Sequence, residues 1–402
     1  MVKKANVLIG VTASIAIYKA LEVISILKKR GFSVRVVLSR EAKEFISPVV
    51  FEAITNQKVY SDVLEEIDFE KTNITHVALA EWADVFAVVP ATANIISKLA
   101  CGIADDPVSL IGLATKATKI IAPAMNSSMY LNPIIQENIA KLKGHGFVFV
   151  GPKEGMLACN TEGIGHIADC EDIADAIESA LYLKQLAGRH VIVTAGPTIE
   201  PVDPVRYLTN HSSGKMGFAL AKIAYFMGAD VHLISGPVCL KTPFGVKRID
   251  VSTTQEMLDA IKTTIDGLDG EIILVMAAAI ADFKPANYAQ TKIKRSDREK
   301  IQIELTSNPD VTASVRDYAF EKSKHLRIVG FAAETDNIIE NAKQKIAKKG
   351  LEFIVANDVK RDDIAFGSDF NEAMIIYPDG RSELLKKDKK EVIAFEILRR
   401  VV

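Results

Sequence analysis

The sequence predicts an α/β fold made of two tandem, doubly wound domains. Short apolar strands alternate with amphipathic helices along the 402 residues, and this alternation favours parallel sheets with right-handed crossovers. HVIVTAGPT at 190–198 repeats the form of NVLIGVTAS at 6–14, a β-branched strand followed by a turn of small residues. The length also allows two or three domains. We therefore predict two domains, residues 1–187 and 188–402.

The first half alternates strands and helices in order. In the expected helix 15–30, apolar residues recur at helical spacing, and the closing KKRG supplies a basic last turn and a glycine C-cap. The strand 84–92 is almost wholly apolar, as expected for a strand covered on both faces. The expected strands are 6–11, 33–39, 84–92, 118–126 and 146–152, with a closing helix at 171–186.

The second half begins the same alternation again. Its expected strands are 190–195, 229–235, 271–279, 327–334 and 353–358, its helices are 214–228, 254–266 and 336–349, and 372–380 forms a hairpin strand and turn. In doubly wound sheets, ligands bind beyond the carboxyl ends of the strands. Because the two halves are not close sequence repeats, we expect two different ligands.

Composition and charge narrow the functional classes. The net charge of −2 gives no basic field that would attract nucleic acid or an anionic membrane. No apolar run approaches the roughly 18–20 residues of a membrane span, and the N-terminal strand is not a signal peptide. The four cysteines lack metal-binding spacing, which predicts a cytoplasmic protein with free thiols. The motifs GIGHIA at 163–168 and SSGKMG at 212–217 lack the context or residues of a dinucleotide fingerprint and a P-loop.

Two segments of the first half offer candidate binding groups. GVTAS at 10–14 places free N–H groups and the hydroxyls of Thr12 and Ser14 at a strand-to-helix turn, which suits a phosphate. A plain turn capped by Ser14 explains the same residues. His76 is either a functional group or a partly buried histidine at the start of a helix.

Two later segments of this half are richer in functional side chains. The loop 123–133 has two prolines that frame Asn126, whose amide can hold a carboxylate without adding charge. The glycine-rich segment 155–169 carries Cys159, a thiol on a flap that can close over a substrate. A stiff loop and an incidental cysteine are the plain alternatives.

In the second half, two segments follow strands. The loop 194–217 contains three prolines and ends in hydroxyl residues and Lys215 at a helix start, which is a natural phosphate cradle. The segment 275–285 has bare alanines that let a base or a ribose lie against the backbone, followed by Asp282, which can bind a hydroxyl group or a metal.

Lysines downstream supply further candidates. The charge run 291–300 and the pair Lys345 and Lys349, four residues apart on one helix face, offer cations to phosphates. Taken alone, each of them is more simply explained as a solvated surface.

In their order along the chain, these motifs carry a resemblance. GVTASIAIYK, ITHVALAEWAD, PATANIISKLACGIADD, PAMNSSMYLNP and GMLACNTEGIGHIAD resemble the flavin-dependent cysteine decarboxylase family over about residues 1–170. The second half resembles the ligase that accompanies it. The whole chain is therefore similar to the bifunctional phosphopantothenoylcysteine decarboxylase/phosphopantothenate–cysteine ligase family of coenzyme A biosynthesis. The resemblance implies a flavodoxin/Rossmann-like flavoprotein domain followed by a Rossmann-like ligase domain.

For the first half, the resemblance implies FMN-dependent oxidative decarboxylation of 4′-phosphopantothenoylcysteine to 4′-phosphopantetheine. FMN would oxidise the cysteine thiol to a thioaldehyde, which accepts electrons as CO₂ leaves to give an enethiolate. His76 would act at the flavin and substrate, and Cys159 would donate a proton. Asn126 and Met129 would bind the substrate. The implied FMN-binding residues are Gly10, Thr12, Ser14, Ser39, Pro90, Ala91, Thr92 and Asn94.

For the second half, the resemblance implies a CTP-dependent ligase that joins 4′-phosphopantothenate to L-cysteine through an acyl-cytidylate. Asn210 and Arg206 would bind the acyl phosphate and the substrate, and Lys292 would offset charge on the triphosphate. Mg²⁺ or Mn²⁺ would accompany CTP, with Asp282 as a candidate ligand. The implied nucleotide-binding residues are Ala278, Asp282, Lys292, Pro309, Asp310, Val311, Thr312, Phe331, Lys345 and Lys349.

The resemblance also implies a homo-oligomer with a trimeric decarboxylase core and dimeric ligase domains, up to a dodecamer. The chain departs from the family pattern at Ala13, at Ile199 and at His166–Ile167, where relatives commonly have glycine, arginine and Arg-Met. One alternative is a flavodoxin-like electron carrier fused to a nucleotide-binding regulatory domain, which leaves the decarboxylase residues unexplained. Another is a decarboxylase of peptide cysteines, against which the fusion to a ligase argues.

Overall fold

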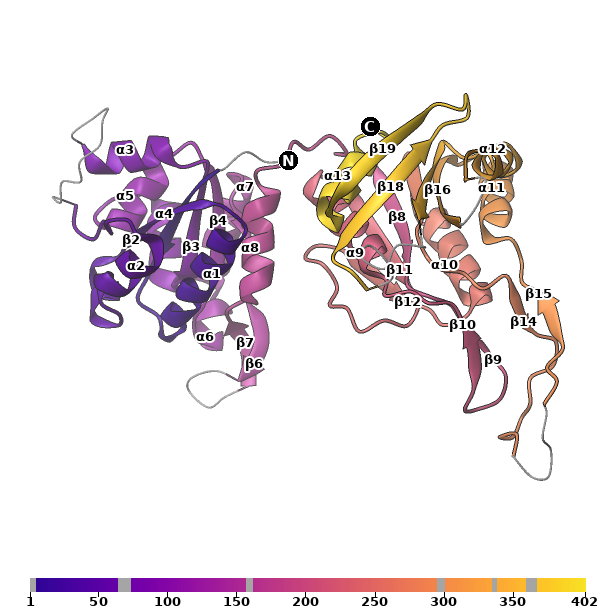
Figure 1. The fold of residues 1–402 in the computed structure, drawn as a ribbon. Helices are drawn as coiled ribbons and strands as arrows, with labels where there is room; N and C mark the ends of the chain where they lie inside the picture. Colours follow the sequence, from indigo (N-terminus) through magenta and orange to yellow (C-terminus); the bar gives the residue numbers. More distant parts are fainter. Residues whose placement is uncertain (1–4, 64–73, 157–161, 295–300, 335–337, 359–366) are drawn as a thin grey trace. The chain divides into compact units, whose positions relative to one another are not determined.

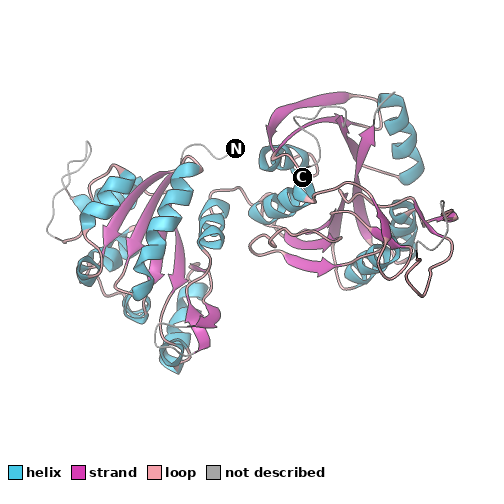
Figure 2. Cartoon of the chain, turned by 60° about the horizontal axis from the view of Figure 1, so that its bottom comes forward, coloured by secondary structure: helices cyan, strands magenta, loops and turns pink. Residues whose placement is uncertain are grey.

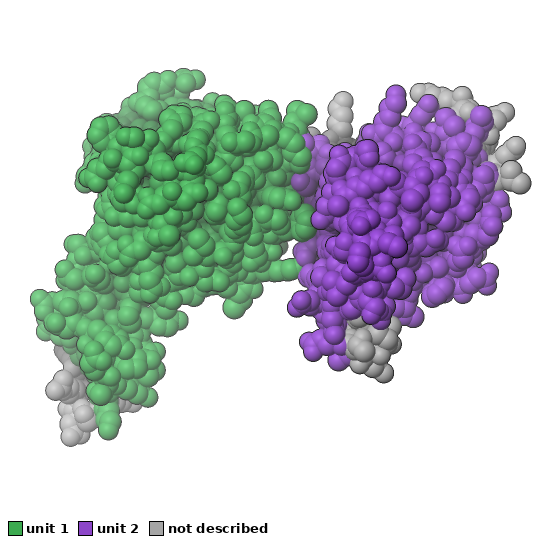
Figure 3. All heavy atoms as spheres, turned by 180° about the vertical axis from the view of Figure 1, so that it is seen from behind, with its two compact units in different colours: residues 1, 183–402 green, residues 2–182 purple. Residues whose placement is uncertain are grey.

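The computed structural model describes residues 5–63, 74–156, 162–294, 301–334, 338–358 and 367–402. The chain forms two compact units, which divide between Tyr182 and Leu183 (Figure 3). This division lies a few residues before the predicted joint at 187/188. In the described part of the chain, no helix is both long and apolar enough to span a bilayer.

The N-terminal unit is built on a five-stranded parallel sheet (Figure 1). The strands are β1 (Asn6–Val11), β2 (Ser33–Leu38), β3 (Val85–Ala91), β4 (Thr118–Pro123) and β5 (Val148–Phe149). Their order, β2-β1-β3-β4-β5, is that of flavodoxin-like folds. The order reverses between β1 and β3, so the ligand crevice is expected at the carboxyl ends of these two strands.

Helices cover both faces of this sheet (Figure 2). One buried cluster joins the sheet to α3, α4, α5 and α7, and α1 packs against α8. A short antiparallel hairpin of β6 (Lys153–Met156) and β7 (Glu162–His166) forms the stem of the predicted flap. The helices are α1 (Tyr18–Lys29), α2 (Pro48–Thr55), α3 (Thr75–Trp82), α4 (Ala93–Cys101), α5 (Pro107–Ala114), α6 (Ser127–Tyr130), α7 (Pro133–Gly144) and α8 (Cys170–Ser179), and the 3₁₀ turns are Ile15–Ile17 and Arg40–Glu44.

The C-terminal unit has an eight-stranded sheet in the order β12-β11-β8-β13-β16-β17-β18-β19. Its strands are β8 (His190–Ala195), β11 (Asp230–Ser235), β12 (Lys247–Asp250), β13 (Glu271–Met276), β16 (His325–Glu334), β17 (Phe353–Asp358), β18 (Phe370–Ile376) and β19 (Ser382–Lys389). The strands from β12 to β17 are parallel and follow the Rossmann order 3-2-1-4-5-6 along the chain. The hairpin β18–β19 adds two antiparallel strands. The doubly wound α/β class is confirmed for both units.

Helices cover this second sheet as well. A buried cluster joins it to α10, α11 and α12, whereas α9 packs against α13. Two small antiparallel ladders, β9 with β10 and β14 with β15, extend away from the sheet (Figure 1). Their bounds are β9 (Ile199–Pro201), β10 (Tyr207–Thr209), β14 (Phe283–Pro285) and β15 (Leu305–Ser307), and the helices are α9 (Lys215–Phe226), α10 (Thr254–Asp266), α11 (Val311–Glu321), α12 (Ile338–Lys349) and α13 (Lys390–Leu398).

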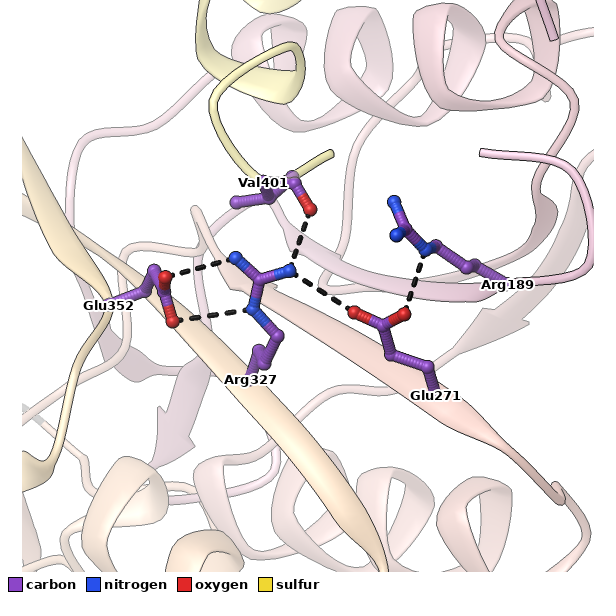
Figure 4. A network of polar contacts seen from close by, with 5 residues as sticks. All are labelled: Arg189, Glu271, Arg327, Glu352 and Val401. Carbon is purple, nitrogen blue, oxygen red and sulfur yellow. Dashed lines mark hydrogen bonds and ion pairs between the residues drawn. The ribbon is translucent and has the colours of Figure 1, made fainter. Parts of the chain in front are cut away.

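An ion-pair network lies at the amino-terminal edge of this sheet (Figure 4). Glu271 accepts hydrogen bonds from Arg189 Nε at 2.8 Å and Arg327 Nη1 at 3.1 Å. Arg327 also binds Glu352 at 2.9 Å and the carbonyl of Val401 at 2.8 Å. Burial acts to raise the pKa of Glu271, but the two guanidinium groups outweigh it and lower this pKa. The network therefore links the start, the centre and the C-terminal segment of the unit.

We expect Glu271→Gln to lower the free energy of unfolding of the C-terminal unit by about 1–2 kcal/mol, because two guanidinium groups lose a charged acceptor that is mostly buried. Folding lowers the pKa of Glu271. The contribution of its carboxylate to stability is therefore fully present above the ordinary carboxyl pKa, and it is lost as the pH falls through the lowered pKa. Urea unfolding at neutral and acidic pH measures both effects. Glu321→Gln, at the exposed end of α11, is the control, and equal losses in both variants would contradict the prediction.

Candidate functional site

Two hollows lie beside the turn that follows β1. The first, which we call the Thr12 hollow, measures about 240 Å³. The second, the Asn126 hollow, measures about 450 Å³, a volume in the range of small-molecule sites. Of the residues predicted to bind FMN or substrate, Thr12, Ser39, Thr92, Asn94 and Met129 line the first hollow, and Ser14 and Asn126 line the second.

The buried hydroxyl of Thr12 ties the ends of β1 and β3 together. It donates to the carbonyl oxygen of Pro90 at 2.8 Å and accepts from the backbone N–H of Thr92 at 3.2 Å. Gly10, on β1 two residues before Thr12, is buried, and a Cβ there would lie 2.8 Å from Val108 Cγ1. Ala91 is likewise buried at the end of β3. Gly10 and Ala91 support the crevice but are not among the residues that line the two hollows. Close packing against Val108 explains why residue 10 is a glycine.

Two serines at this edge keep donors available. Ser14 Oγ accepts from the N–H of Ala16 at 3.3 Å, and Ser39 Oγ accepts from the N–H of Ala42 at 3.2 Å. Among the described residues, no acceptor takes the hydrogen of either hydroxyl. Since a hydroxyl both accepts and donates, each serine can still donate to an anion in its hollow.

The flap stem is docked against the loop that carries Asn126. The N–H of Met125 donates to the carbonyl of Gly165 at 3.1 Å, and Ser127 Oγ donates to the carbonyl of Ile164 at 2.6 Å. Gly165 has φ of +143°, and a Cβ there would lie 2.1 Å from the carbonyl oxygen of Met125. Only glycine allows this approach. Because Gly165 also lines the Asn126 hollow, the docked stem forms one wall of the site.

Neither the predicted catalytic histidine nor the predicted catalytic cysteine is among the described residues that line the two hollows. His76, the second residue of α3, lines neither hollow. That another copy of the chain supplies His76 stays a prediction. Cys159 lies outside the described residues, between the two strands of the flap stem. Burial raises the pKa of the Cys170 thiol to about 12, so Cys170 is a poor proton donor.

Three charged residues of the Thr12 hollow, Glu41, Lys98 and Asp106, were missed by motif analysis. Lys98, paired with Asp105 at 2.8 Å, lies one helical turn beyond Asn94 on α4, and this spacing of four could have identified it. Asp106 accepts from the N–H of Arg40 at 3.1 Å, and burial raises the pKa of its carboxyl group. No local signal marks Asp106, because Arg40 is remote in sequence.

The C-terminal unit has a hollow of about 280 Å³ at the carboxyl end of β13 and beside the middle of β16, where Gly330 and Phe331 lie. Segments that are far apart in sequence line it. The predicted nucleotide-binding residues among them are Ala278, Asp282, Pro309, Asp310, Val311, Thr312, Phe331, Lys345 and Lys349. Lys292 is not among the lining residues; it is exposed on the arm that connects β14 to β15. We call this site the Asp310 hollow.

A lysine, an aspartate and a helix start meet at the Asp310 hollow. Lys349 Nζ lies 3.0 Å from Asp310, whose carboxylate also caps α11 through the N–H of Ala313. Burial acts to raise the pKa of Asp310, but the hydrogen bond from Lys349 outweighs it and lowers this pKa. Asn308 Oδ1 is buried beside the hollow without a hydrogen-bond partner among the described residues. The site therefore offers cations, helix N–H groups and one neutral acceptor.

The predicted acyl-phosphate residue is docked next to this hollow. Asn210 Nδ2 donates to the carbonyl of Ile280 at 3.0 Å, within the alanine-rich segment that lines the Asp310 hollow. Lys215, which motif analysis placed in a phosphate cradle, instead lies 2.6 Å from Asp369. The charge of Lys215 is therefore already partnered.

Asp203 holds the substrate loop to the Lys292 arm. Its buried carboxylate accepts from Arg206 Nη1 at 2.8 Å and from the N–H of Ile293 at 3.1 Å, and Arg206 also donates to the carbonyl of Ile293. Burial acts to raise the pKa of Asp203, but the N–H groups of Val205, Ile293 and Arg206 outweigh it and lower this pKa to about 2. The turn from Asp203 to Arg206 is a local signal, since an aspartate often accepts from N–H groups two and three residues on, but the contact with Ile293 arises only in the fold.

Comparisons with known proteins match both units. A family model described as Flavoprotein matches residues 1–182, and one described as the DNA/pantothenate metabolism flavoprotein C-terminal domain matches residues 186–402. The coenzyme A biosynthesis bifunctional protein CoaBC of Bacillus subtilis is 41% identical, with 100% of this chain and 97% of the relative covered. This chain belongs to that family. It is a bifunctional enzyme of coenzyme A biosynthesis, with a flavoprotein decarboxylase half and a ligase half.

One further relative and two solved structures are also similar to this chain. The CoaBC protein of Escherichia coli strain K12 is 39% identical over 99% of this chain and 96% of its own length. The C-terminal domain of a CoaBC protein is 34% identical, covering 54% of this chain and 96% of that one, with a TM-score of 0.45. The FMN-dependent cysteine decarboxylase SpaF is 31% identical, covering 45% of this chain and 99% of that one, with a TM-score of 0.40.

Proposed function

We propose that this chain converts 4′-phosphopantothenate into 4′-phosphopantetheine in two steps. In the ligase half, the substrate carboxylate attacks the α-phosphorus of CTP, pyrophosphate leaves, and the amine of L-cysteine then displaces CMP to form the amide. In the flavoprotein half, the cysteine carboxyl group of this product leaves as CO₂. The proposal is supported most directly by the Asp310 hollow, which gathers all but one of the predicted nucleotide-binding residues beside Asn210.

In the ligase half, each group has a defined role. Lys345, Lys349 and the start of α11 would bind phosphate oxygens, and the small residues of 278–281 would let the base approach the backbone. Asn308 Oδ1 has no hydrogen-bond partner among the described residues, so once this side chain turns toward the hollow it can accept a hydrogen bond from the amino group of a cytosine. Mg²⁺ fits the exposed carboxylate of Asp282, a hard oxygen ligand at the hollow, and would neutralise phosphate charge.

In the flavoprotein half, neutral donors bind the charged group. The hydroxyls of Ser14 and Ser39 fit the phosphate of FMN, which supplies the two-electron oxidation of the substrate thiol when bound. Asn126 would hold the substrate carboxyl or amide group. Cys159 would donate a proton, and His76 would come from another copy of the chain. This last role requires an oligomer of the flavoprotein half, and we propose a homo-oligomer with a trimeric core and dimeric ligase domains.

Reconstitution of the full chain with FMN, Mg²⁺, 4′-phosphopantothenate, L-cysteine and CTP tests the proposal. We expect pyrophosphate release that depends on CTP, and mass spectrometry should show 4′-phosphopantetheine with one CO₂ per turnover. Replacement of CTP by ATP measures nucleotide preference. Absence of CTP-dependent pyrophosphate would refute the ligase assignment. Reversible flavin reduction without CO₂ release would refute the decarboxylase assignment and favour an electron carrier.

A further inference from the structure

Two imidazole rings and a carboxylate converge at the amino-terminal edge of the second sheet. His190 begins β8, and Asp230 and His232 lie two residues apart on β11. The parallel register places Asp230 directly opposite His190. Because residues two apart on a strand share a face, all three side chains lie on the same face of the sheet. None of the three lines the Asp310 hollow, and none belongs to the ion-pair network of Figure 4.

The ligand atoms have nearly the spacing of a metal site. His190 Nδ1 lies 3.1 Å and His232 Nε2 lies 3.4 Å from the same carboxylate oxygen of Asp230. All three atoms lie within 4.8 Å of one another. A tetrahedral ion with ligand bonds of about 2.1 Å separates its ligands by about 3.4 Å. Two of the three separations are therefore close to this value, and the third is no more than 4.8 Å.

The surroundings suit a bound ion as well. The other oxygen of Asp230 lies 2.8 Å from Lys247 Nζ on β12, which fixes the carboxylate as outer hydrogen bonds do in metal sites. The rings of His190 and His232 keep 23% and 14% of their side-chain surface exposed, so an ion has access from solvent. All the ligands stand on strands, which hold a geometry more firmly than loops do.

We propose that His190, Asp230 and His232 bind one transition-metal dication of the zinc type. Two imidazoles and one carboxylate are a ligand set that Zn²⁺ accepts, with water in the fourth position, whereas Mg²⁺ prefers an all-oxygen set. The neighbouring Lys247 ammonium repels a cation, so the site binds more weakly than one without it.

This ion is separate from the one that accompanies the nucleotide. His190 pairs with Ile272 on β13, and Met276, four residues further along that strand, lines the Asp310 hollow. Four residues of strand span about 13 Å. A bound ion would therefore cross-link β8 to β11 at the edge opposite the nucleotide. It would stabilise the C-terminal unit without entering the reaction.

Metal titration of the full chain tests this site. The protein is first freed of metal by a chelator, and zinc chloride or cobalt chloride is then titrated without nucleotide, with calorimetry for Zn²⁺ and visible absorption for Co²⁺. We expect one ion per chain in the unsubstituted protein. His190→Gln, His232→Gln and Asp230→Asn should each weaken binding at least tenfold, because a direct ligand matters at least as much as an outer-shell partner, worth about 10–100-fold.

His325→Gln is the matched control, because His325 is an exposed histidine at the same edge of the same sheet, opposite Glu271. This variant should bind the ion as the unsubstituted chain does. Zn²⁺ should also raise the Tm of the unsubstituted chain and of His325→Gln, but not that of the three ligand variants. The Tm without metal shows whether each variant folds. If His232→Gln does not fold, His190→Gln still tests the site, because the ring of His190 is the more exposed of the two.

Three outcomes would overturn the proposal. The first is a lack of saturable binding by the unsubstituted chain. The second is unchanged affinity in all the ligand variants. The third is a cobalt spectrum with thiolate charge-transfer bands, which would place the ion on exposed cysteines such as Cys101 and Cys239.

Discussion

Gly165→Ala is expected to lower the decarboxylation rate by about 10²-fold or more while the ligase rate is unchanged. The added Cβ would lie 2.1 Å from the carbonyl oxygen of Met125, and the backbone at φ of +143° disfavours any side chain. The flap stem must then move away from the loop that carries Asn126, and the hydrogen bonds of Met125 and Ser127 to the stem are lost. A displacement of about 1 Å at a reacting group is enough for a loss of this size.

The same hairpin supplies the control for this prediction. A Cβ on Gly155, in β6, would have its nearest neighbour at 3.8 Å, on His166, which is ordinary contact. Gly155→Ala should therefore decarboxylate normally. CO₂ release from supplied 4′-phosphopantothenoylcysteine gives the rate, and the flavin absorbance of the purified protein reports cofactor retention. If Gly165→Ala keeps the normal rate with its flavin bound, the docked stem is not a wall of the site.

Asp203→Ala is expected to lower the ligase rate about 10²-fold while decarboxylation is retained. The carboxylate joins Arg206, in the substrate loop, to Ile293, next to Lys292 on the arm. Without this carboxylate, the N–H groups of Val205, Arg206 and Ile293 lose their acceptor. Arg206, the predicted substrate contact, and Lys292, the predicted nucleotide contact, can then move away from their positions. Asp203 is thus a positioning residue rather than a catalytic one.

The pH dependence follows from the lowered pKa of Asp203, about 2 in the fold. A carboxyl group whose pKa is lowered by folding contributes stability above its ordinary pKa and loses that contribution as the pH falls through the folded value. The anchor should therefore persist at every pH above about 4, and Asp203 should add no acidic limb to the ligase profile near neutrality. Asp203→Asn should keep part of the rate, because an amide oxygen still accepts N–H bonds.

A matched control is available on the β18–β19 turn. Asp379 accepts from the N–H of Arg381 at 3.0 Å and from its Nε at 2.6 Å, but this pair is exposed to solvent. Asp379→Ala should leave kcat and KM of ligation unchanged. Separate measurement of kcat, KM and Tm tells positioning from simple unfolding. A folded Asp203→Ala protein with normal ligation would remove the anchor from the mechanism.

Strands with a strong local signal were predictable from the sequence. The apolar run 84–92 became β3, which is buried throughout, and HVIVTA became β8 at the centre of the second sheet. The expected strand 146–152 shrank to Val148–Phe149, because its last residues leave the sheet toward the flap stem. Buried runs thus specify strands, whereas strand ends depend on neighbouring segments.

Contacts between distant segments were not predictable. The β9–β10 ladder lies inside a proline-rich stretch that reads as a loop, and its Ile199 N–H donates to the carbonyl of Ser252. Lys215 has the composition of a phosphate ligand but pairs with Asp369, far along the chain. The candidate site residues came largely from the resemblance, and the fold adds the anchors Asp106 and Asp203 around them.

The packing of α13 sets an order for folding during synthesis. Helix α13 covers the sheet beside α9, and the carbonyl of Val401 binds Arg327 in the network of Figure 4. The ribosome completes the N-terminal unit first, so its flavin site can form while the second unit is still emerging. The ligase unit, in contrast, lacks one covering helix until Lys390–Leu398 have been synthesised. A stop codon placed before residue 390 should therefore impair ligation and spare the flavoprotein half.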